Sequence, residues 1–332
     1  MGTVYHRSGD HRVLSVRSPA KVNLYLEVLG RRSDRFHEID TLMQAISLSD
    51  ELVFEREADG QVQLTVSSDD GQDCPPATED NLVLRAARAA MAEAGRRGMM
   101  DRITGVSIRL HKRIPMGAGL GGGSSNAAWT LLGLNRLWNL NLDVEALGHL
   151  AEGLGSDVKF FLYGGLARCQ GRGERVSPIG ESIVVGTFHY VLAKPALGLS
   201  TALIYKELGS STPLGKPLTI PKSLTTMNFD AIWSALRAGE LFGNRLQEVA
   251  FRVLPELREV FDLFARAPFQ IAQLTGSGST LFGLCRDAED AEAIAGHLRE
   301  EFGRRAGPSR EGGGTRVWVA RSVPSWLADA LS

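Results

Sequence analysis

The segment PMGAGLGGGSS at residues 115–125 constrains the fold most, because a glycine-dense loop here runs directly into an apolar helix. Glycine lets the backbone adopt positive φ and approach an anion closely, so successive N–H groups can converge on phosphate oxygens. The helix that follows adds unpaired N–H donors and the positive end of its dipole. Ser124 or Ser125 can cap this helix or offer a hydroxyl to phosphate or metal. The loop therefore predicts a site for nucleotide phosphates.

Other phosphate-binding loops fit this segment less well. Its glycines satisfy the dinucleotide pattern G-x-G-x-x-G, and Asp143 lies at about the ribose-binding spacing of roughly 20 residues. Pro115, however, separates the loop from the strand-like run at 106–110, and no convincing second strand leads up to Asp143. A Walker loop is excluded because no lysine precedes Ser124. A protein-kinase glycine loop is excluded because its valine and the V-A-I-K, H-R-D and D-F-G motifs are missing. A Rossmann dinucleotide site remains the weaker alternative.

Length and composition limit the class of protein. A chain of 332 residues suggests two domains, at about 100–200 residues each. The formal net charge is −1 without a basic stripe, so we expect no nucleic-acid partner. Residues 1–17 lack the apolar stretch of a signal peptide, and no run of about 18 apolar residues occurs, so we expect a cytoplasmic protein without a membrane partner. Three widely separated cysteines argue against a disulfide framework and a zinc site.

Hydrophobic periodicity predicts a mixture of helices and strands. Apolar and polar residues alternate over 21–28, so this strand should bury one face and present Lys21 and Asn23 together on the other. In the first half of the chain we expect further strands at 13–16, 52–54, 62–66 and 106–110, and helices at 82–94, 125–138 and 144–154. A second unit should open with a strand at 183–193. It should continue with helices at 201–208, 229–238, 255–267 and 288–302 and strands at 271–274, 280–285 and 316–321.

Three separated segments resemble the signature motifs of the GHMP kinase superfamily, in the same chain order. They are SPAKVNLYL at 18–26, the glycine loop, and LTGSGS at 274–279. Supporting segments are RRSDRFH at 31–37, GSDV at 155–158, GRGE at 171–174 and GLSTALIY at 198–205. The resemblance spans most of the chain and is closest to the branch that phosphorylates 4-diphosphocytidyl-2-C-methyl-D-erythritol. It implies ATP-dependent phosphorylation of the 2-hydroxyl of that compound, in non-mevalonate isoprenoid precursor biosynthesis.

The resemblance also implies an α+β fold of two domains with the catalytic cleft between them. A left-handed βαβ N-terminal domain that binds ATP is expected over residues 1–170. A ferredoxin-like C-terminal domain that binds the substrate is expected over 171–321. Residues 322–332 are expected to pack back on the first domain.

Two residues are implied to be catalytic. In the superfamily, an aspartate in the position of Asp157 acts as base, and a lysine in the position of Lys21 pairs with it and faces the acceptor. A carboxylate beside a lysine keeps a low pKa and can accept the hydroxyl proton, while the lysine offsets developing negative charge. Taken alone, Lys21 would be a solvated surface residue and Asp157 a helix N-cap. Their joint placement in the motifs favours the catalytic roles.

ATP and Mg²⁺ are the implied cofactors, since a divalent cation usually bridges and offsets the phosphates. The ATP site is expected on the loop residues Pro115, Met116, Gly117, Ala118, Gly119, Leu120, Gly121, Gly122, Gly123, Ser124 and Ser125. No clear carboxylate ligand for the metal is found beyond Asp157. The metal ligands therefore stay unassigned, as does the oligomeric state.

A small-molecule substrate, a cytidine diphosphate sugar alcohol, is implied for the rest of the cleft. The residues expected to contact it are Asn23, Phe36, His37, Thr201, Tyr205, Gly276 and Ser277. Phe36 is expected to stack on the cytosine, His37 to hydrogen-bond it, and Tyr205 to close its other face. The turn at 276–277 is expected near the diphosphate. Ordinary core packing is the alternative for the two aromatic rings.

Two positions depart from the pattern of the superfamily branch. Arg35 stands where a glycine usually precedes the aromatic–histidine pair, so the loop that aims His37 is expected to be repositioned. Lys159 stands where a proline usually follows Asp157-Val158. It is expected to loosen the turn and to add a positive charge close to the base or the phosphates.

Two further alternatives stay open. Another GHMP small-molecule kinase, of the mevalonate or homoserine type, would keep the loop and Asp157 without a site for a base. A non-catalytic nucleotide sensor on the same scaffold would bind ATP without phosphorylating any acceptor.

Overall fold

The computed structural model describes residues 5–7, 13–69, 71, 74–179, 186–209, 229–306 and 314–326. Its larger sheet has eight strands. They are β1 (Tyr5–Arg7), β2 (Val13–Arg31), β3 (His37–Glu57), β4 (Val62–Ser68), β5 (Gly105–Lys112), β6 (Leu166–Gly171), β7 (Arg175–Ile179) and β9 (Gly243–Asn244). The main order is β1-β2-β3-β5-β4, with β6 paired to β3 and β7, and β9 paired to β2.

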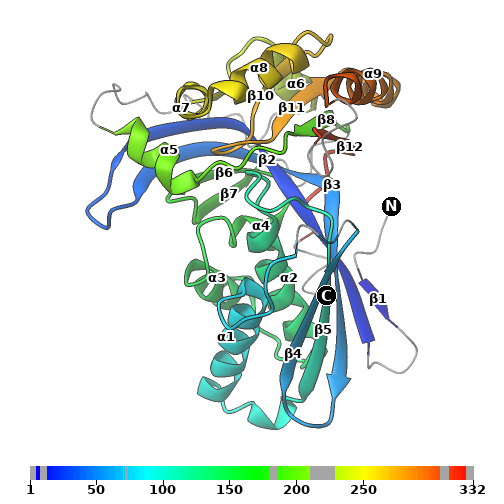
Figure 1. Cartoon of the computed structure of the whole chain (residues 1–332). Helices are drawn as coiled ribbons and strands as arrows, with labels where there is room; N and C mark the ends of the chain where they lie inside the picture. Colours follow the sequence, from blue (N-terminus) through cyan, green and yellow to red (C-terminus); the bar gives the residue numbers. More distant parts are fainter. Residues whose placement is uncertain are drawn as a thin grey trace.

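Strands β2 and β3 form a long antiparallel hairpin that runs between the two halves of the molecule (Figure 1). The strands expected at 13–16 and 21–28 are parts of this one β2 strand, and register shifts interrupt its pairing at three places. Elements cover the central part of β2 on both sides, so Lys21 and Asn23 are only 4% and 1% exposed. The expectation that this strand buries a single face was therefore wrong at the site itself.

Helices cover one face of the larger sheet (Figure 1). They are α1 (Leu82–Arg96), α2 (Gly122–Leu137), α3 (Val144–Glu152) and the short α4 (Phe160–Tyr163), with a 3₁₀ turn, η1, at Met100–Arg102. Asn81 caps α1 by accepting the N–H of Val83, and Asp143 caps α3 by accepting the N–H of Ala146. Helix α2 is buried along most of its length against the sheet and α1. The glycine loop therefore leads into the most enclosed helix of this domain.

The smaller sheet has the strand order β10-β11-β8-β12 and is antiparallel throughout. Its strands are β8 (His189–Lys194), β10 (Ile271–Leu274), β11 (Leu281–Cys285) and β12 (Arg316–Arg321). With it come helices α5 (Thr201–Leu208), α6 (Phe229–Arg237), α7 (Gln247–Val253), α8 (Pro255–Phe264) and α9 (Ala288–Ala306). The chain order and strand order are those of a ferredoxin-like unit. The strand expected at 183–193 begins only at His189, and residues 183–185 lie outside the described residues.

The two sheets are joined through β2. Gln273 Nε2, on β10, donates to the backbone carbonyls of Asn23 and Leu24 at 2.9 Å each. At the other end of the chain, Ser322 and Ser325 form isolated bridges with Ile46 and Gly164. The division of the chain at residue 170 stays a proposal, and β7, which follows that point, still belongs to the larger sheet.

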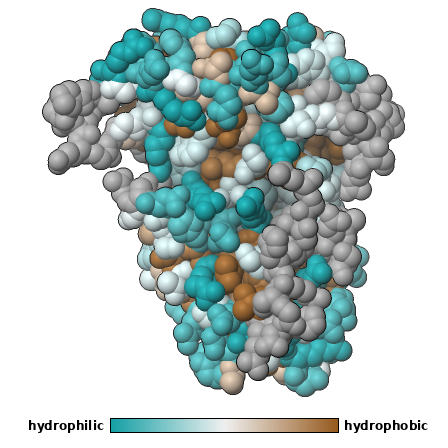
Figure 2. Space-filling view, turned by 90° about the vertical axis from the view of Figure 1, so that its right-hand side faces the viewer, coloured by the Kyte–Doolittle hydropathy of each residue, from teal (hydrophilic) through white to brown (hydrophobic). Residues whose placement is uncertain are grey.

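The surface is mostly polar on the side shown in Figure 2, where hydrophobic residues form small groups among hydrophilic ones. Within the ranges given above, no helix combines the length and hydrophobicity needed to cross a membrane.

Candidate active site

The glycine loop adopts the conformation that its sequence predicts. Gly117, Gly119 and Gly121 have φ of 57°, 75° and 72°, which side-chain-bearing residues rarely adopt. Helix α2 begins at Gly122, earlier than the expected residue 125, because the left-handed Gly121 is its N-cap. No side chain caps the helix, so the capping role considered for the serines was wrong.

The first helical turn of α2 supplies N–H donors. Its first backbone hydrogen bond runs from Ser125 N to Gly121 O, so the N–H groups of residues 122–124 precede the helical hydrogen bonds. Ser125 is buried, and its hydroxyl accepts a 2.8 Å hydrogen bond from Ser18. The half-buried Ser124 is therefore the serine whose hydroxyl is better placed to reach a ligand.

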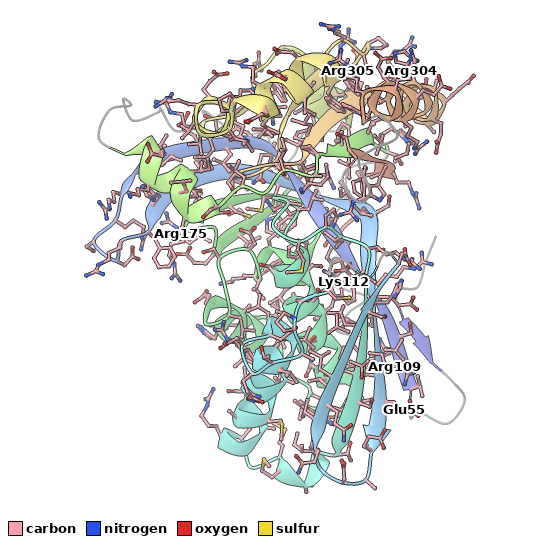
Figure 3. The ribbon with its side chains drawn as sticks, viewed as in Figure 1. Glu55, Arg109, Lys112, Arg175, Arg304 and Arg305 are labelled. Atoms are coloured by element: carbon pink, nitrogen blue, oxygen red, sulfur yellow. The ribbon has the colours of Figure 1, made fainter. Side chains whose placement is uncertain are left out.

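A buried ion pair, which no sequence pattern predicted, lies between the two ends of the glycine loop. Lys112, which is labelled in Figure 3, pairs with Asp50, and both side chains are at most 3% exposed. Asp50 Oδ1 also accepts the N–H groups of Arg113 and Ile114 at 2.7 and 2.8 Å, and Asn126 donates to Oδ2 at 2.9 Å. Charge-assisted bonds of this kind fix both the end of β5 and the first turn of α2.

Lys21 and Asp157 lie together, as expected. Lys21 Nζ is 3.7 Å from Asp157 Oδ2, and it donates to Asn23 Oδ1 at 2.6 Å and to the carbonyl of Gly119 at 2.8 Å. Burial lowers the pKa of the Lys21 ammonium, and the neighbouring Asp157 charge opposes this shift in pKa. The carboxylate is 27% exposed, so it faces an accessible space. A buried cation beside a reachable carboxylate suits proton removal with charge compensation.

Asp157 occupies a turn and not the start of a helix. Helix α4 begins at Phe160, with Lys159 preceding it as N-cap. The interpretation of Asp157 as an N-cap is therefore wrong. Its side chain instead lines the cavity beside Lys21.

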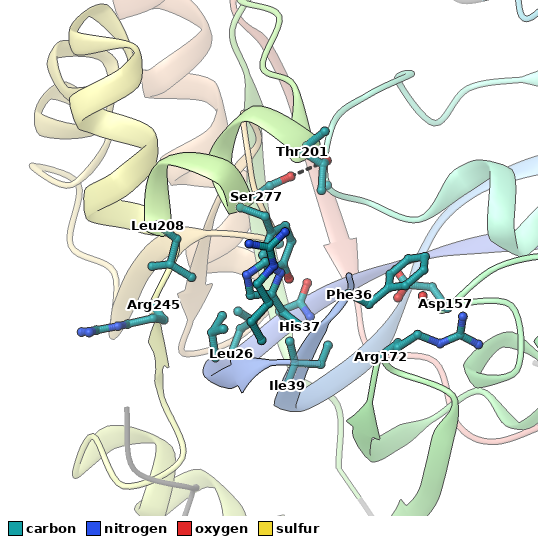
Figure 4. A pocket seen from close by; sticks show the side chains of 18 of the residues that line it. Leu26, Phe36, His37, Ile39, Asp157, Arg172, Thr201, Leu208, Arg245 and Ser277 are labelled. Atoms are coloured by element: carbon teal, nitrogen blue, oxygen red, sulfur yellow. Dashed lines mark hydrogen bonds between the residues drawn. The ribbon is translucent and has the colours of Figure 1, made fainter. Parts of the chain in front are cut away.

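A cavity of about 1080 Å³ collects the expected substrate residues (Figure 4). All seven of them line it, with Lys21, Asp157 and, from the glycine loop, Gly119 and Gly121. Its charged lining consists of Lys21, Arg31, Arg35, Arg172, Lys206, Arg245 and the carboxylate of Asp157. An excess of cations suits an anionic ligand such as a diphosphate.

The aromatic residues are arranged differently from the expected base sandwich. His37 stacks on Tyr205, with ring centroids 4.8 Å apart and 28° between the ring planes. Phe36 is 49% exposed, and the Arg172 guanidinium lies 5.0 Å from the centroid of its ring (Figure 4). Burial and the nearby Arg31 charge both lower the pKa of His37, so its imidazole is neutral near pH 7 and offers one donor and one acceptor. The stacking role of Phe36 stays a prediction.

Side chains join the turn at 275–279 to neighbouring elements, and one of them, Asn244, was not among the expected site residues. Asn244 Nδ2 donates to the carbonyls of Leu274 and Gly276 at 2.9 and 2.8 Å. Ser277 Oγ lies 2.8 Å from Thr201 Oγ1, which joins the turn to the start of α5. These contacts hold the turn against the cavity that it lines.

The two departures from the family pattern have structural outcomes. Arg35 takes the left-handed conformation itself, with φ of 71°, which costs roughly 1–2 kcal/mol for a residue with a Cβ. Lys159 pairs with Glu152 on α3, at 2.5 Å, and is not among the residues that line the cavity. The expectation that Lys159 adds a positive charge close to the base was therefore wrong. Its φ of −64° is also the angle that proline would impose.

Metal-binding side chains do not form a cluster in the parts of the chain that the structure describes. There, no three His, Cys, Asp or Glu side chains converge as a metal site would require. Among the described residues that line the cavity, Asp157 is the single carboxylate. A divalent ion here would therefore need phosphate oxygens among its ligands.

The sequence matches the family "GHMP kinases N terminal domain" over residues 81–165 and "GHMP kinases C terminal" over residues 229–304. The chain is 40% identical to a 4-diphosphocytidyl-2-C-methyl-D-erythritol kinase of Pelotomaculum thermopropionicum over 293 residues, which cover 86% of this chain and 94% of that protein. It is 39% identical to the enzyme of the same name from Rhodococcus jostii over 294 residues, which cover 86% and 88% of the two chains. Among solved structures, a 4-(cytidine 5'-diphospho)-2C-methyl-D-erythritol kinase aligns with a TM-score of 0.71 at 34% identity, over 93% of this chain and 98% of that one. A homoserine kinase from Cytophaga hutchinsonii, at 20% identity and a TM-score of 0.66 over 97% and 98% of the chains, shares the fold.

Proposed function

The chain belongs to the GHMP kinases and, within them, to the 4-diphosphocytidyl-2-C-methyl-D-erythritol kinase family, and from this we propose its reaction. The enzyme transfers the γ-phosphoryl group of ATP to the 2-hydroxyl of 4-diphosphocytidyl-2-C-methyl-D-erythritol. This step serves isoprenoid precursor synthesis by the non-mevalonate route. The two-domain α+β fold and the ATP-dependent small-molecule kinase activity that the three motifs predict are both confirmed by the family matches.

One observation carries the proposal for the site. The Lys21–Asp157 pair, two glycines of the phosphate loop and all seven expected substrate residues line the same cavity. An acceptor bound there places its hydroxyl within reach of the carboxylate, while the loop N–H groups hold the ATP phosphates. Positioning and charge compensation supply most of the catalysis in phosphoryl transfer.

Each residue then has a definite task. Asp157 accepts the proton of the acceptor hydroxyl as the hydroxyl oxygen attacks the γ-phosphorus. Lys21 offsets the negative charge that develops between donor and acceptor. Mg²⁺, when bound with ATP, would neutralise phosphate charge, and Ser124 is the side chain that we propose to help hold it. The neutral His37 imidazole hydrogen-bonds the cytosine.

The pH dependence of kcat tests the proposed role of Lys21. Because burial lowers the pKa of its ammonium below the usual 10.5, the charged form is lost as pH rises through this lowered value. We expect kcat of the wild type to fall on the alkaline side, before an exposed lysine would titrate. The guanidinium of the Lys21→Arg variant stays charged over this range. We therefore expect this variant to have a lower kcat than the wild type but no alkaline decline of kcat. A wild-type kcat that stays constant up to about pH 10 would contradict this role.

Turnover with a panel of acceptors tests the function. We expect ATP-dependent phosphorylation of 4-diphosphocytidyl-2-C-methyl-D-erythritol and none of mevalonate or homoserine. His37→Ala should lower kcat/KM for the cytidylyl substrate about tenfold, the effect of losing one or two hydrogen bonds, with the KM for ATP unchanged. His149→Ala is the matched control, because His149 is 72% exposed on α3. Failure of the wild type to phosphorylate the cytidylyl substrate would refute the function, and equal effects of the two histidine variants would refute the base contact.

A further inference from the structure

Thr275 lies where the three motif segments meet. Its side chain is fully buried, and its hydroxyl oxygen accepts the backbone N–H of Asn23 at 3.1 Å. The same oxygen is 3.2 Å from Asn23 Oδ1 and 3.2 Å from the carbonyl oxygen of Gly119. A hydroxyl has one proton, so it donates to one of these two acceptors at a time.

Both acceptors also hold the Lys21 ammonium. Lys21 Nζ donates to Asn23 Oδ1 at 2.6 Å and to Gly119 O at 2.8 Å, while its separation from Asp157 is longer, at 3.7 Å. Asn23 is fixed on its other side as well, because its Nδ2 donates to Thr41 Oγ1 at 2.9 Å. The amide of Asn23 therefore serves mainly to orient Lys21, although this asparagine also lines the cavity.

The backbone around Thr275 is fixed independently of its hydroxyl. Its N–H donates to the carbonyl of Thr280 and its carbonyl accepts the N–H of Gly278, each at 3.0 Å. Removing only the hydroxyl therefore leaves the turn intact, and changes the hydrogen bonding around Lys21.

We propose that Thr275 is a positioning residue for phosphoryl transfer, which acts on Lys21 through Asn23 and the Gly119 carbonyl. The proposal rests on the function stated above. Its hydroxyl donates to one or the other of the two oxygens that orient the ammonium, so that the glycine loop, Lys21 and the C-terminal turn stay in register. A shift of about 1 Å in such a group can cost roughly a hundredfold in rate.

Two substitutions separate positioning from packing. Thr275→Val replaces the hydroxyl by a methyl group of similar size, and Thr275→Ser keeps the hydroxyl. We expect Thr275→Val to lower kcat about 10- to 100-fold, with the KM for ATP within about twofold of wild type. Thr275→Ser should recover most of the rate. Wild-type kcat in Thr275→Val, or equal losses in both variants that follow their losses in melting temperature, would overturn the proposal.

A double-mutant cycle tests the route through Asn23. If Thr275 acts through it, the variant with both Asn23→Ala and Thr275→Val should lose little more activity than Asn23→Ala alone. Fully multiplicative losses would contradict this route.

A readout that needs no acceptor keeps this inference distinct from the proposed function. The Lys21 titration, followed by NMR and assigned with Lys21→Arg, should shift in Thr275→Val and stay as in wild type in Thr275→Ser. An unchanged titration in Thr275→Val would count against the positioning role. Failure of the wild type to phosphorylate the cytidylyl substrate would refute the function, while the titration still decides the role of Thr275.

Discussion

Asp157→Asn is expected to lower kcat by about 10²–10⁴-fold while leaving the KM for ATP nearly unchanged. Asparagine has the shape of aspartate but cannot take the proton of the attacking hydroxyl. The side chain is 27% exposed and lies in a turn, so the substitution should not disturb the fold. Because the Asp157 charge raises the pKa of Lys21, its loss should also move any alkaline decline of kcat to lower pH. Steady-state kinetics with both substrates, over a range of pH, measures these effects.

Glu152→Gln is the matched control for this experiment. Glu152 is a nearby carboxylate, but it pairs with Lys159 on the surface of α3 and does not line the cavity. Its removal should leave kcat close to that of the wild type, since partly exposed ion pairs contribute little. If Asp157→Asn kept more than about a tenth of the wild-type kcat, Asp157 would not be the proton acceptor.

Local sequence signals predicted much of the fold correctly. The helices at 82–94, 144–154 and 201–208 were expected within a few residues of their observed bounds, because apolar periodicity and caps such as Asn81 and Asp143 act over a few residues. The start of α2 was missed because a left-handed glycine replaced the usual polar N-cap. The continuity of β2 was missed because its bulges interrupt the alternation of the hydrophobic residues.

The residues of the candidate site could be predicted where they belong to sequence motifs. They could not be predicted where only contacts between distant parts of the chain define their role. Lys21 and Asp157 were found by resemblance, and the structure places them 3.7 Å apart. The Asp50–Lys112 pair joins residues 62 positions apart, and no local pattern marks either of them. Thr275 was quoted as part of a turn, but its contact with Asn23 spans 252 positions and exists only in the folded chain. The first contact depends on the pairing of β3 with β5 within the larger sheet, and the second depends on how the two sheets pack together.

Arg35 adopts a backbone conformation that usually requires glycine. A glycine would take its φ of 71° at no steric cost, and the arginine takes it nonetheless. Two backbone hydrogen bonds close the surrounding turn: the N–H of Arg35 donates to the carbonyl of Arg32, and the N–H of Arg32 donates to the carbonyl of Phe36. The expectation of a repositioned loop stays a prediction.

Gly119→Ala is expected to cause the second large loss of activity. A Cβ at this position would lie 2.2 Å from the carbonyl oxygen of Thr275, and φ is 75°. The glycine loop and the turn at 275–279 would have to separate, which would displace the carbonyl that holds Lys21 and the N–H groups that face the phosphates. We expect kcat/KM for ATP to fall at least about a hundredfold. The left-handed strain alone should destabilise the protein by about 1–2 kcal/mol, which thermal unfolding would detect.

Gly117→Ala is the control that separates collision from strain. Gly117 also has a positive φ, of 57°, but a Cβ there would meet nothing within 4 Å. This variant should therefore show only the conformational cost, about 1–2 kcal/mol, and a much smaller loss of kcat/KM. Equal losses in the two variants would mean that flexibility of the loop matters more than its close approach to Thr275. A larger loss in Gly119→Ala would instead tie catalysis to the contact between the nucleotide loop and the C-terminal turn, because only that variant forces them apart.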